Sequence, residues 1–222
     1  MAIFREWFSF DGFNAWKLRT WADYAYFLAL VAVGVVIFTL VNRRIRRGRT
    51  PERAAARTAA RLKALGGSGA VCYTDKTVHF RQESRHCDLI CVARDRVYVV
   101  KVFHFGLQIE GSAGDRKWRL ISGKDVVQED NPQPSLNEQR AILTRLFAGA
   151  GMNNVPVETL IVFADNFGTV HSHLKGVKNA VVYRQLKEWR KGNPLKGTPL
   201  QKERVCEALE QSFRSPEEAA VA

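Results

Sequence analysis

The chain has 222 residues, of which 46% are hydrophobic, and a formal net charge of +12 with a sequence pI near 9.9. This hydrophobic content is enough for a core in one domain of ordinary size, and the charge favours anionic partners, either nucleic acid or an anionic membrane surface. Four cysteines are too few for a disulfide-stapled scaffold, which excludes that class, and we expect them to be reduced thiols.

The N-terminal part of the chain contains two apolar segments. Residues 1–23 are rich in aromatic side chains, of which Phe4, Trp7 and Phe8 share one face at helical spacing. This segment is expected either to lie in a membrane interface or to bind a partner. Residues 24–41 carry no charged side chain. As a helix they would cover about 27 Å, so we predict one transmembrane helix here.

A basic linker at residues 42–50 follows this predicted helix. Positive charge concentrated after a transmembrane helix places that side in the cytoplasm. The sequence therefore predicts a single-pass membrane protein with its N-terminus outside and its main domain cytoplasmic. The same linker carries candidate contacts to anionic lipid headgroups, namely Arg43, Arg44, Arg46 and Arg47.

Residues 51–214 are expected to form the cytoplasmic domain, and residues 215–222 a disordered tail. Thr50 and Pro51 predict the start of a helix that ends near Leu65. Short apolar runs and turn residues predict the remaining elements. Strands are expected at 70–74, 77–81, 88–93, 96–103, 117–121, 157–164 and 180–183, and helices at 136–148, 184–191 and 198–213. This order is typical of an α/β domain with a central mixed sheet flanked by helices.

An acid that opens one strand, a lysine within the next strand and a following glycine turn resemble a known family. Residues 52–183 are similar to the nuclease-related domain (NERD) family of the restriction-endonuclease-like superfamily. The resemblance implies a restriction-endonuclease-like fold and, in active members, cleavage of phosphodiester bonds with Mg²⁺. The residues that carry it are Asp88 with Leu89 and Ile90, the strand Val97 to Val102, Gly106, Ile109, Gly111, Trp118, the pair Asn131 and Pro132, and the helix with Ile142, Leu143 and Leu146.

The resemblance also implies a catalytic set, an acid on the first core strand and Glu-x-Lys on the next. Two carboxylates on neighbouring strands hold Mg²⁺, which activates water and offsets charge on the attacked phosphate. By position the acid is Asp88, the glutamate falls on Lys101 and the lysine falls on Phe103. A single carboxylate opposite an ammonium repels Mg²⁺ more than it recruits it, so the resemblance with these departures predicts impaired catalysis.

Two flanking polar positions of the family also differ in this chain. A glutamate expected in the first helix falls near Ala55, with Glu52 about one turn away. A glutamine expected after the Asn-Pro pair falls on Ser135, with Gln139 one helical turn further.

Two arrangements of the acid remain open. In the first, Asp88 and Lys101 form a salt bridge across paired strands and no cofactor is bound. In the second, Asp88 and Glu110 bind Mg²⁺ and Lys101 serves as the catalytic lysine. A second carboxylate close to Asp88 on the face of Lys101 would favour the second arrangement.

Basic residues line two of the predicted helices. The candidate contacts to a nucleic-acid backbone are Arg53, Arg57, Arg61, Lys187, Arg190 and Lys191. The alternative for this basic face is contact with lipid or with a protein partner. We predict a membrane-anchored, catalytically impaired NERD protein that binds nucleic acid or acts as a scaffold. The alternatives are an active Mg²⁺-dependent nuclease with a rearranged site and a membrane-associated assembly component.

The remaining candidate ligands favour ordinary structural roles. Cys87 and Cys91 lie four residues apart on a predicted strand, which is too far apart for one tetrahedral zinc ion. We therefore expect buried apolar cysteines. His171 and His173 are expected in a solvent-exposed loop.

Overall fold

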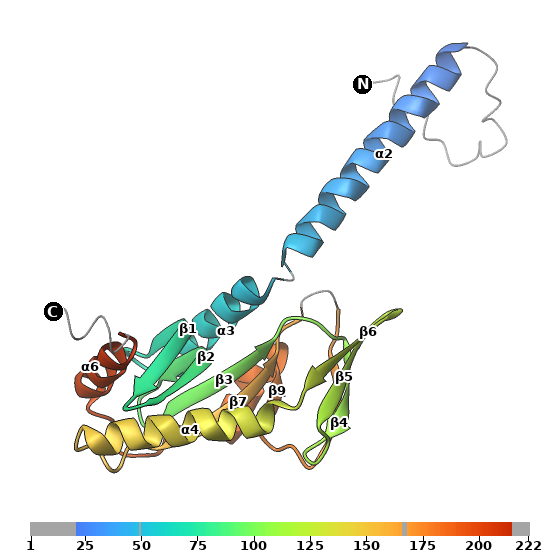
Figure 1. Cartoon of the computed structure of the whole chain (residues 1–222). Coiled ribbons are helices and arrows are strands. Elements are labelled where there is room, and N and C mark those ends of the chain that lie inside the picture. Colours follow the sequence, from blue (N-terminus) through green and yellow to red (C-terminus); the bar gives the residue numbers. More distant parts are fainter. Residues whose placement is uncertain (1–20, 49, 166–167, 215–222) are drawn as a thin grey trace. The chain divides into compact units, whose positions relative to one another are not determined.

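The structure is a computed structural model that describes residues 21–48, 50–165 and 168–214, without the side chains of residues 22–26 and 44–48. It divides into two compact units, Met1–Arg46 and Arg47–Ala222 (Figure 1). The predictions made for residues 1–20 and for the tail at 215–222 lie outside the described residues.

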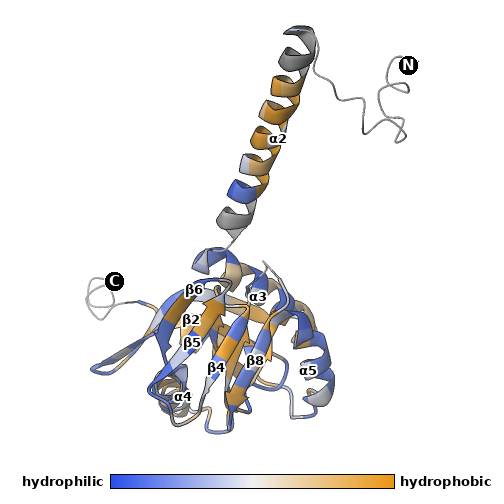
Figure 2. Cartoon of the chain, turned by 90° about the vertical axis from the view of Figure 1, so that its right-hand side faces the viewer, coloured by the Kyte–Doolittle hydropathy of each residue, from blue (hydrophilic) through white to orange (hydrophobic). Residues whose placement is uncertain are grey.

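A single helix, α2 (Trp21–Gly48), spans the described part of the first unit. Its residues 27–41 are uncharged and exposed, and most of the stretch is coloured as hydrophobic in Figure 2. Within the described parts of the chain, no helix is both long and apolar enough to cross a membrane. The transmembrane helix at residues 24–41 is thus not confirmed and stays a prediction. Since α2 continues to Gly48, most of the predicted basic linker is helical.

The second unit is built on a central mixed sheet, as the sequence predicts, and this sheet has five strands. Its spatial order is β1 (Val71–Phe80), β2 (Glu83–Val92), β3 (Val97–Phe103), β7 (Val157–Phe163) and β9 (Ala180–Val182). The first three strands pair antiparallel, and β3, β7 and β9 pair parallel. Strands β3 and β7 and the second half of β2 are mostly buried, because helices cover both faces of the sheet.

Helices cover the two faces of this sheet in pairs (Figure 1). On one face lie α3 (Pro51–Leu65) and α5 (Leu186–Gly192), the latter preceded by a short 3₁₀ turn, η2 (Tyr183–Gln185). On the other face lie α4 (Pro132–Gly149) and α6 (Lys202–Ser212). The helix predicted at 136–148 begins earlier, because Asn131 caps it by accepting a 3.0 Å hydrogen bond from the backbone N–H of Gln133. The helix predicted at 198–213 is shorter.

A second, four-stranded sheet was not predicted. Its order is β6 (Asp125–Asp130), β5 (Lys117–Ser122), β4 (Gln108–Ser112) and β8 (His171–Lys175). The expectation of a loop for His171 and His173 was wrong, although both side chains are exposed. The polar strands β6 and β8 lack the alternation of apolar and polar residues that predicts a strand. In addition, β8 pairs with β4, which is far from it in the sequence.

An aromatic cluster joins the two sheets. The ring of Phe103 on β3 stacks on that of Phe163 on β7 at 5.4 Å between centroids, and Trp118 on β5 lies 6.4 Å from Phe103. Trp118 is fully buried and donates from Nε1 to the carbonyl of Ser112 at 2.9 Å. A Cβ on Gly111 would lie 2.5 Å from Trp118 Cδ1, so only glycine fits beside this indole. Gly111 and Trp118 therefore serve packing.

The strands predicted at 70–74 and 77–81 form one continuous strand, β1. Asp75 lies within it at a φ of 55°, a left-handed conformation that acids adopt more readily than most residues. The local Thr-Asp-Lys sequence favours a turn, but pairing with β2 on both sides of Asp75 keeps the chain in the sheet. As part of one strand, Asp75 lies beside Asp88 on β2.

Candidate functional site

Asp88 and Lys101 face each other on neighbouring strands. Leu89 on β2 pairs with Val100 on β3 in antiparallel register, so the next positions along each strand are opposite. Lys101 Nζ lies 3.0 Å from Asp88 Oδ2 and donates to Oδ1 at 3.2 Å, and the Val102 backbone N–H donates to Oδ2 at 3.3 Å. The predicted salt bridge is present, and it engages both carboxylate oxygens.

A second acid completes a row across three strands. The pairs on either side, Thr74 with Leu89 and Lys76 with Cys87, place Asp75 opposite Asp88. His86 lies between them, with Nε2 3.5 Å from Asp75 Oδ1 and 4.0 Å from Asp88 Oδ1. The Asp75 side chain is exposed, whereas that of Asp88 is 21% exposed.

Asp75 was not predicted as a site residue, because it falls between the strands expected at 70–74 and 77–81. The available signal was the symmetry of the hairpin about Arg81 and Gln82, which pairs position 75 with position 88 if the two short strands are taken as one.

This row borders a pocket of about 370 Å³. The start of α3 contributes Glu52, β3 contributes Lys101, and the second sheet contributes Glu129. The polar and aromatic lining residues are Glu52, Thr74, Asp75, His86, Asp88, Lys101, Phe103, His104, Phe105 and Glu129. The pocket therefore holds four carboxylates and a single lysine, and it is acidic.

Comparison with protein-family profiles matches residues 47–164 to the nuclease-related domain. The chain belongs to the NERD family. No significant match was found among curated proteins or among solved structures. The match extends from the end of α2 through β7 and includes the whole row from Asp75 to Lys101. Strands β8 and β9 and helices α5 and α6 lie beyond it.

Active nuclease-related domains usually depend on Mg²⁺, and the Asp88–Lys101 pair does not fit that ion as it stands. The Lys101 ammonium is bound to the carboxylate that would have to coordinate the metal, and a cation is repelled by it. Across the described residues, no group of three or more His, Cys, Asp or Glu side chains is arranged to hold a metal ion. Phe103, at the position of the family's lysine, is 6% exposed and packed in the aromatic cluster.

Glu110 is not brought together with Asp88 and Lys101. It lies on β4 in the second sheet, where it accepts hydrogen bonds from Gln108 at 2.7 Å and from Arg119 at 3.3 Å. It is not among the described residues that line the pocket. The rearranged site built from Asp88, Lys101 and Glu110 therefore has no geometric support here. The other acids that line the pocket with Asp88 are Glu52, Asp75 and Glu129.

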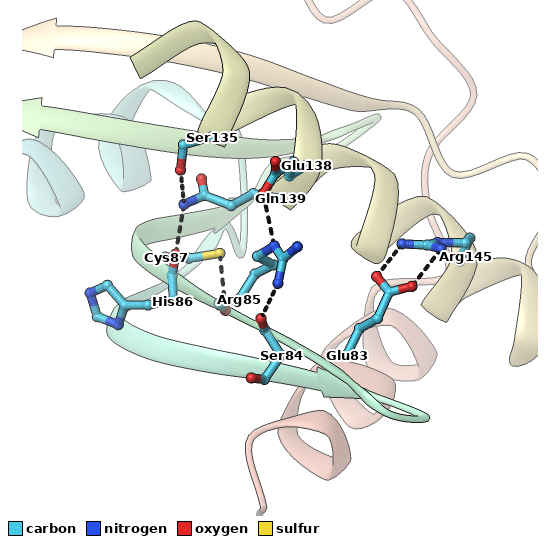
Figure 3. A network of polar contacts seen from close by, with 9 residues as sticks. All are labelled: Glu83, Ser84, Arg85, His86, Cys87, Ser135, Glu138, Gln139 and Arg145. Atoms are coloured by element: carbon cyan, nitrogen blue, oxygen red, sulfur yellow. Dashed lines mark hydrogen bonds and ion pairs between the residues drawn. The ribbon is translucent and has the colours of Figure 1, made fainter. Parts of the chain in front are cut away.

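Of the two polar residues considered after the Asn-Pro pair, Gln139 links α4 to β2, and Ser135 accepts a hydrogen bond from it. Figure 3 shows Gln139 on α4 between Ser135 and the β1–β2 hairpin. Its Nε2 donates to the His86 carbonyl at 2.6 Å and to Ser135 Oγ at 3.4 Å. Further along α4, Arg145 pairs with Glu83 at the hairpin tip. These contacts tie α4 to the strand that carries Asp88 and fix the position of that strand.

The predicted basic residues divide into two groups. Arg57 donates to the Ala164 carbonyl at 3.0 Å, and Arg190 donates to the Leu65 carbonyl at 3.2 Å and to the Tyr98 hydroxyl at 3.1 Å. These two guanidinium groups are partly buried and stabilise the fold. The exposed basic face, as the term is used below, consists of Arg53, Arg61, Lys187 and Lys191. It lies on α3 and α5, which pack on the same side of the five-stranded sheet.

Proposed function

We propose that this NERD domain binds nucleic acid without cleaving it, and that α2 anchors the domain to a membrane. The observation that carries the first part is the Asp88–Lys101 salt bridge, in which an ammonium stands where a second metal-binding carboxylate is needed. Binding is supported by the exposed basic face and by the net charge of +12. Because the pocket itself is acidic, phosphate contacts belong on the α3–α5 side.

Binding is tested with the unit from Arg47 to Ala222 and labelled DNA and RNA over a range of salt concentrations. Changing Arg53, Arg61, Lys187 and Lys191 together to glutamine is expected to weaken binding. If each residue neutralises one phosphate, the slope of log K against log salt should fall by about 3–4. The matched control changes four exposed basic residues on other elements to glutamine, Lys117, Lys124, Arg140 and Lys175.

A control variant that weakens binding as much as the basic-face variant would show that only total charge matters. Affinity that does not fall with added salt would contradict phosphate contacts. Binding to anionic vesicles and not to either nucleic acid would assign the basic face to lipid.

A retained nuclease is the second candidate, because Asp75 and Glu52 line the same pocket as Asp88. Incubation of the same unit with DNA and RNA plus Mg²⁺ or Mn²⁺ separates the two. We expect no cleavage above background by the wild-type protein or by Asp88→Ala. Cleavage by the wild type that disappears in Asp88→Ala would replace the first proposal with this one.

The anchoring proposal rests on α2, whose uncharged residues 27–41 expose large apolar side chains such as Leu28 and Phe38. Such a surface is unfavourable in water. We expect the full chain to stay in the membrane pellet after alkaline washing. Placing arginine at both Val33 and Ile37 should release it, since each charge costs about 2.5–3.5 kcal/mol at a helix centre. Release of the wild-type chain by alkali would contradict the proposal.

A further inference from the structure

Two cysteines face each other across the β1–β2 hairpin, in the part of the core beneath α3. Cys72 and Cys91 are direct partners in the antiparallel register. The Cys72 thiol lies 2.7 Å from Cys91 Sγ and 3.5 Å from the Ala59 carbonyl on α3. Both are free thiols, Cys91 buried and Cys72 half-buried. The predicted burial of Cys87 and Cys91 is confirmed, but the contact with Cys72 was not predicted.

We propose that Cys72 and Cys91 are an oxidation site, which a hydroperoxide converts into a disulfide between β1 and β2. Directly opposed residues of an antiparallel pair have Cα atoms about 4.5–5.5 Å apart. Disulfides span Cα separations of about 4.4–6.8 Å, so the separation of these two strands suits the bond. Cys87 has no such partner, because its register position on β1 is Lys76.

The two thiols have different roles in this chemistry. The hydrogen bond with Cys91 lowers the pKa of Cys72, with a smaller contribution from the charge of Lys63, and the two outweigh the effect of burial. The same hydrogen bond, together with burial, raises the pKa of Cys91. Because the thiolate is the nucleophile, the more accessible Cys72 is the attacking residue and Cys91 the resolving one.

The reaction takes place in two steps. The Cys72 thiolate attacks one peroxide oxygen, the O–O bond breaks, and the departing oxygen takes a proton and leaves as an alcohol or water. Cys72 is then a sulfenic acid. The Cys91 sulfur attacks the Cys72 sulfur, and the hydroxyl leaves as water with the proton from Cys91. The two thiols together lose two electrons, and the hydroperoxide is reduced.

The disulfide would act close to the acidic row. Cys72 lies three residues before Asp75 on β1, and Cys91 lies three residues after Asp88 on β2. A disulfide between Cys72 and Cys91 would keep β1 and β2, the strands that carry Asp75 and Asp88, paired in the same register. This oxidation site does not depend on whether the domain binds or cleaves nucleic acid.

The experiment treats the purified full chain with hydrogen peroxide, alkylates the remaining thiols and maps the peptides by mass spectrometry without reduction. We expect a peptide pair linked through Cys72 and Cys91, loss of two of the four titratable thiols, and full recovery after a thiol reductant. Cys87 and Cys206 should not be oxidised, and both should be found in the alkylated form. A variant with Cys87→Ala and Cys206→Ser keeps the reacting pair and should form the same link.

The Cys91→Ala variant separates the two steps, because Cys72 should then stop at the sulfenic acid and react with a dimedone probe. Four thiols left intact in the wild type, a link through Cys87 or Cys206, or irreversible oxidation of Cys72 with no link would each overturn the proposal.

Discussion

Replacing Lys101 with glutamate is expected to give the pocket a measurable affinity for Mg²⁺ and Mn²⁺, with a dissociation constant on the order of 1 mM. The new carboxylate would stand opposite Asp88 on the neighbouring strand, in place of the ammonium now 3.0 Å away. Asp75, opposite Asp88 on the other side, supplies a further hard oxygen ligand nearby. Titration calorimetry and the broadening of NMR signals by Mn²⁺ measure the gain.

Lys101→Met is the matched control, because it removes the ammonium but adds no ligand. We expect it to bind either metal far more weakly than Lys101→Glu, and we expect Asp88→Ala to abolish the gain when combined with Lys101→Glu. Equal metal binding by Lys101→Met and Lys101→Glu would show that charge repulsion alone keeps cations out. Metal binding by the unmodified chain would contradict the assignment of Lys101 as the blocking residue.

Metal binding by Lys101→Glu should not restore cleavage, because the family's lysine position is occupied by Phe103. This ring is buried against Phe163 and Trp118 and helps to join the two sheets. Its loss would cost about 3–5 kcal/mol, and a lysine there would also bury a charge. The fold therefore tolerates a carboxylate at position 101 far better than a lysine at position 103. Metal binding can thus be restored in this domain without restoring catalysis.

Elements with a strong apolar pattern could be predicted from the sequence, and polar elements could not. The buried strands β3 and β7 and the helix α3, with Thr50 as its cap, follow from local sequence. In contrast, β6 is exposed along its whole length and has no apolar alternation, so only its pairing with β5 defines it. The second sheet therefore depends on tertiary contacts that a local pattern does not contain.

The candidate site was predictable where two residues face each other in a short hairpin. The salt bridge between Asp88 and Lys101 follows from the tight turn between β2 and β3. Asp75 was missed because it falls between the strands predicted at 70–74 and 77–81, whereas the long β1–β2 pairing joins the two into one strand. Arg57 was predicted as a binding residue but has a structural role. Its spacing from Arg53 and Arg61 suggests an exposed stripe, whereas its guanidinium donates a hydrogen bond to the Ala164 carbonyl.

Asp95→Asn is expected to lower the free energy of unfolding of the second unit by roughly 2–4 kcal/mol at neutral pH. The Asp95 carboxylate is fully buried in the turn between β2 and β3. It accepts hydrogen bonds from Arg96 Nε and Nη2, both at 3.0 Å, and from the Gly197 backbone N–H at 2.8 Å. It thus ties this turn to the segment before α6, and an amide would turn one of these donors into an unsatisfied group.

The matched control is Glu158→Gln, which removes the other carboxylate that binds Arg96, at 2.7 Å. Because Glu158 is 45% exposed, this change should cost less than about 1 kcal/mol. Urea unfolding of both variants and of the wild type measures the difference. Equal destabilisation by the two variants would show that the burial of Asp95 is not what matters.

The loss in free energy of unfolding caused by Asp95→Asn should become smaller as the pH falls. Burial alone would raise the pKa of Asp95, but the hydrogen bonds from Arg96 and Gly197 and the charges of Arg96 and Arg190 outweigh it and hold the pKa below its ordinary value of 3.8. A lowered carboxyl pKa stabilises the fold fully above the unfolded-state pKa, and this stabilisation is lost as the pH falls through the folded-state pKa. The difference in the free energy of unfolding between wild type and variant should therefore be constant above about pH 5 and become smaller below about pH 4. A gap that widens on acidification would mean that protonation of Asp95 strengthens its contacts with Arg96 and Gly197, the opposite of what their geometry requires.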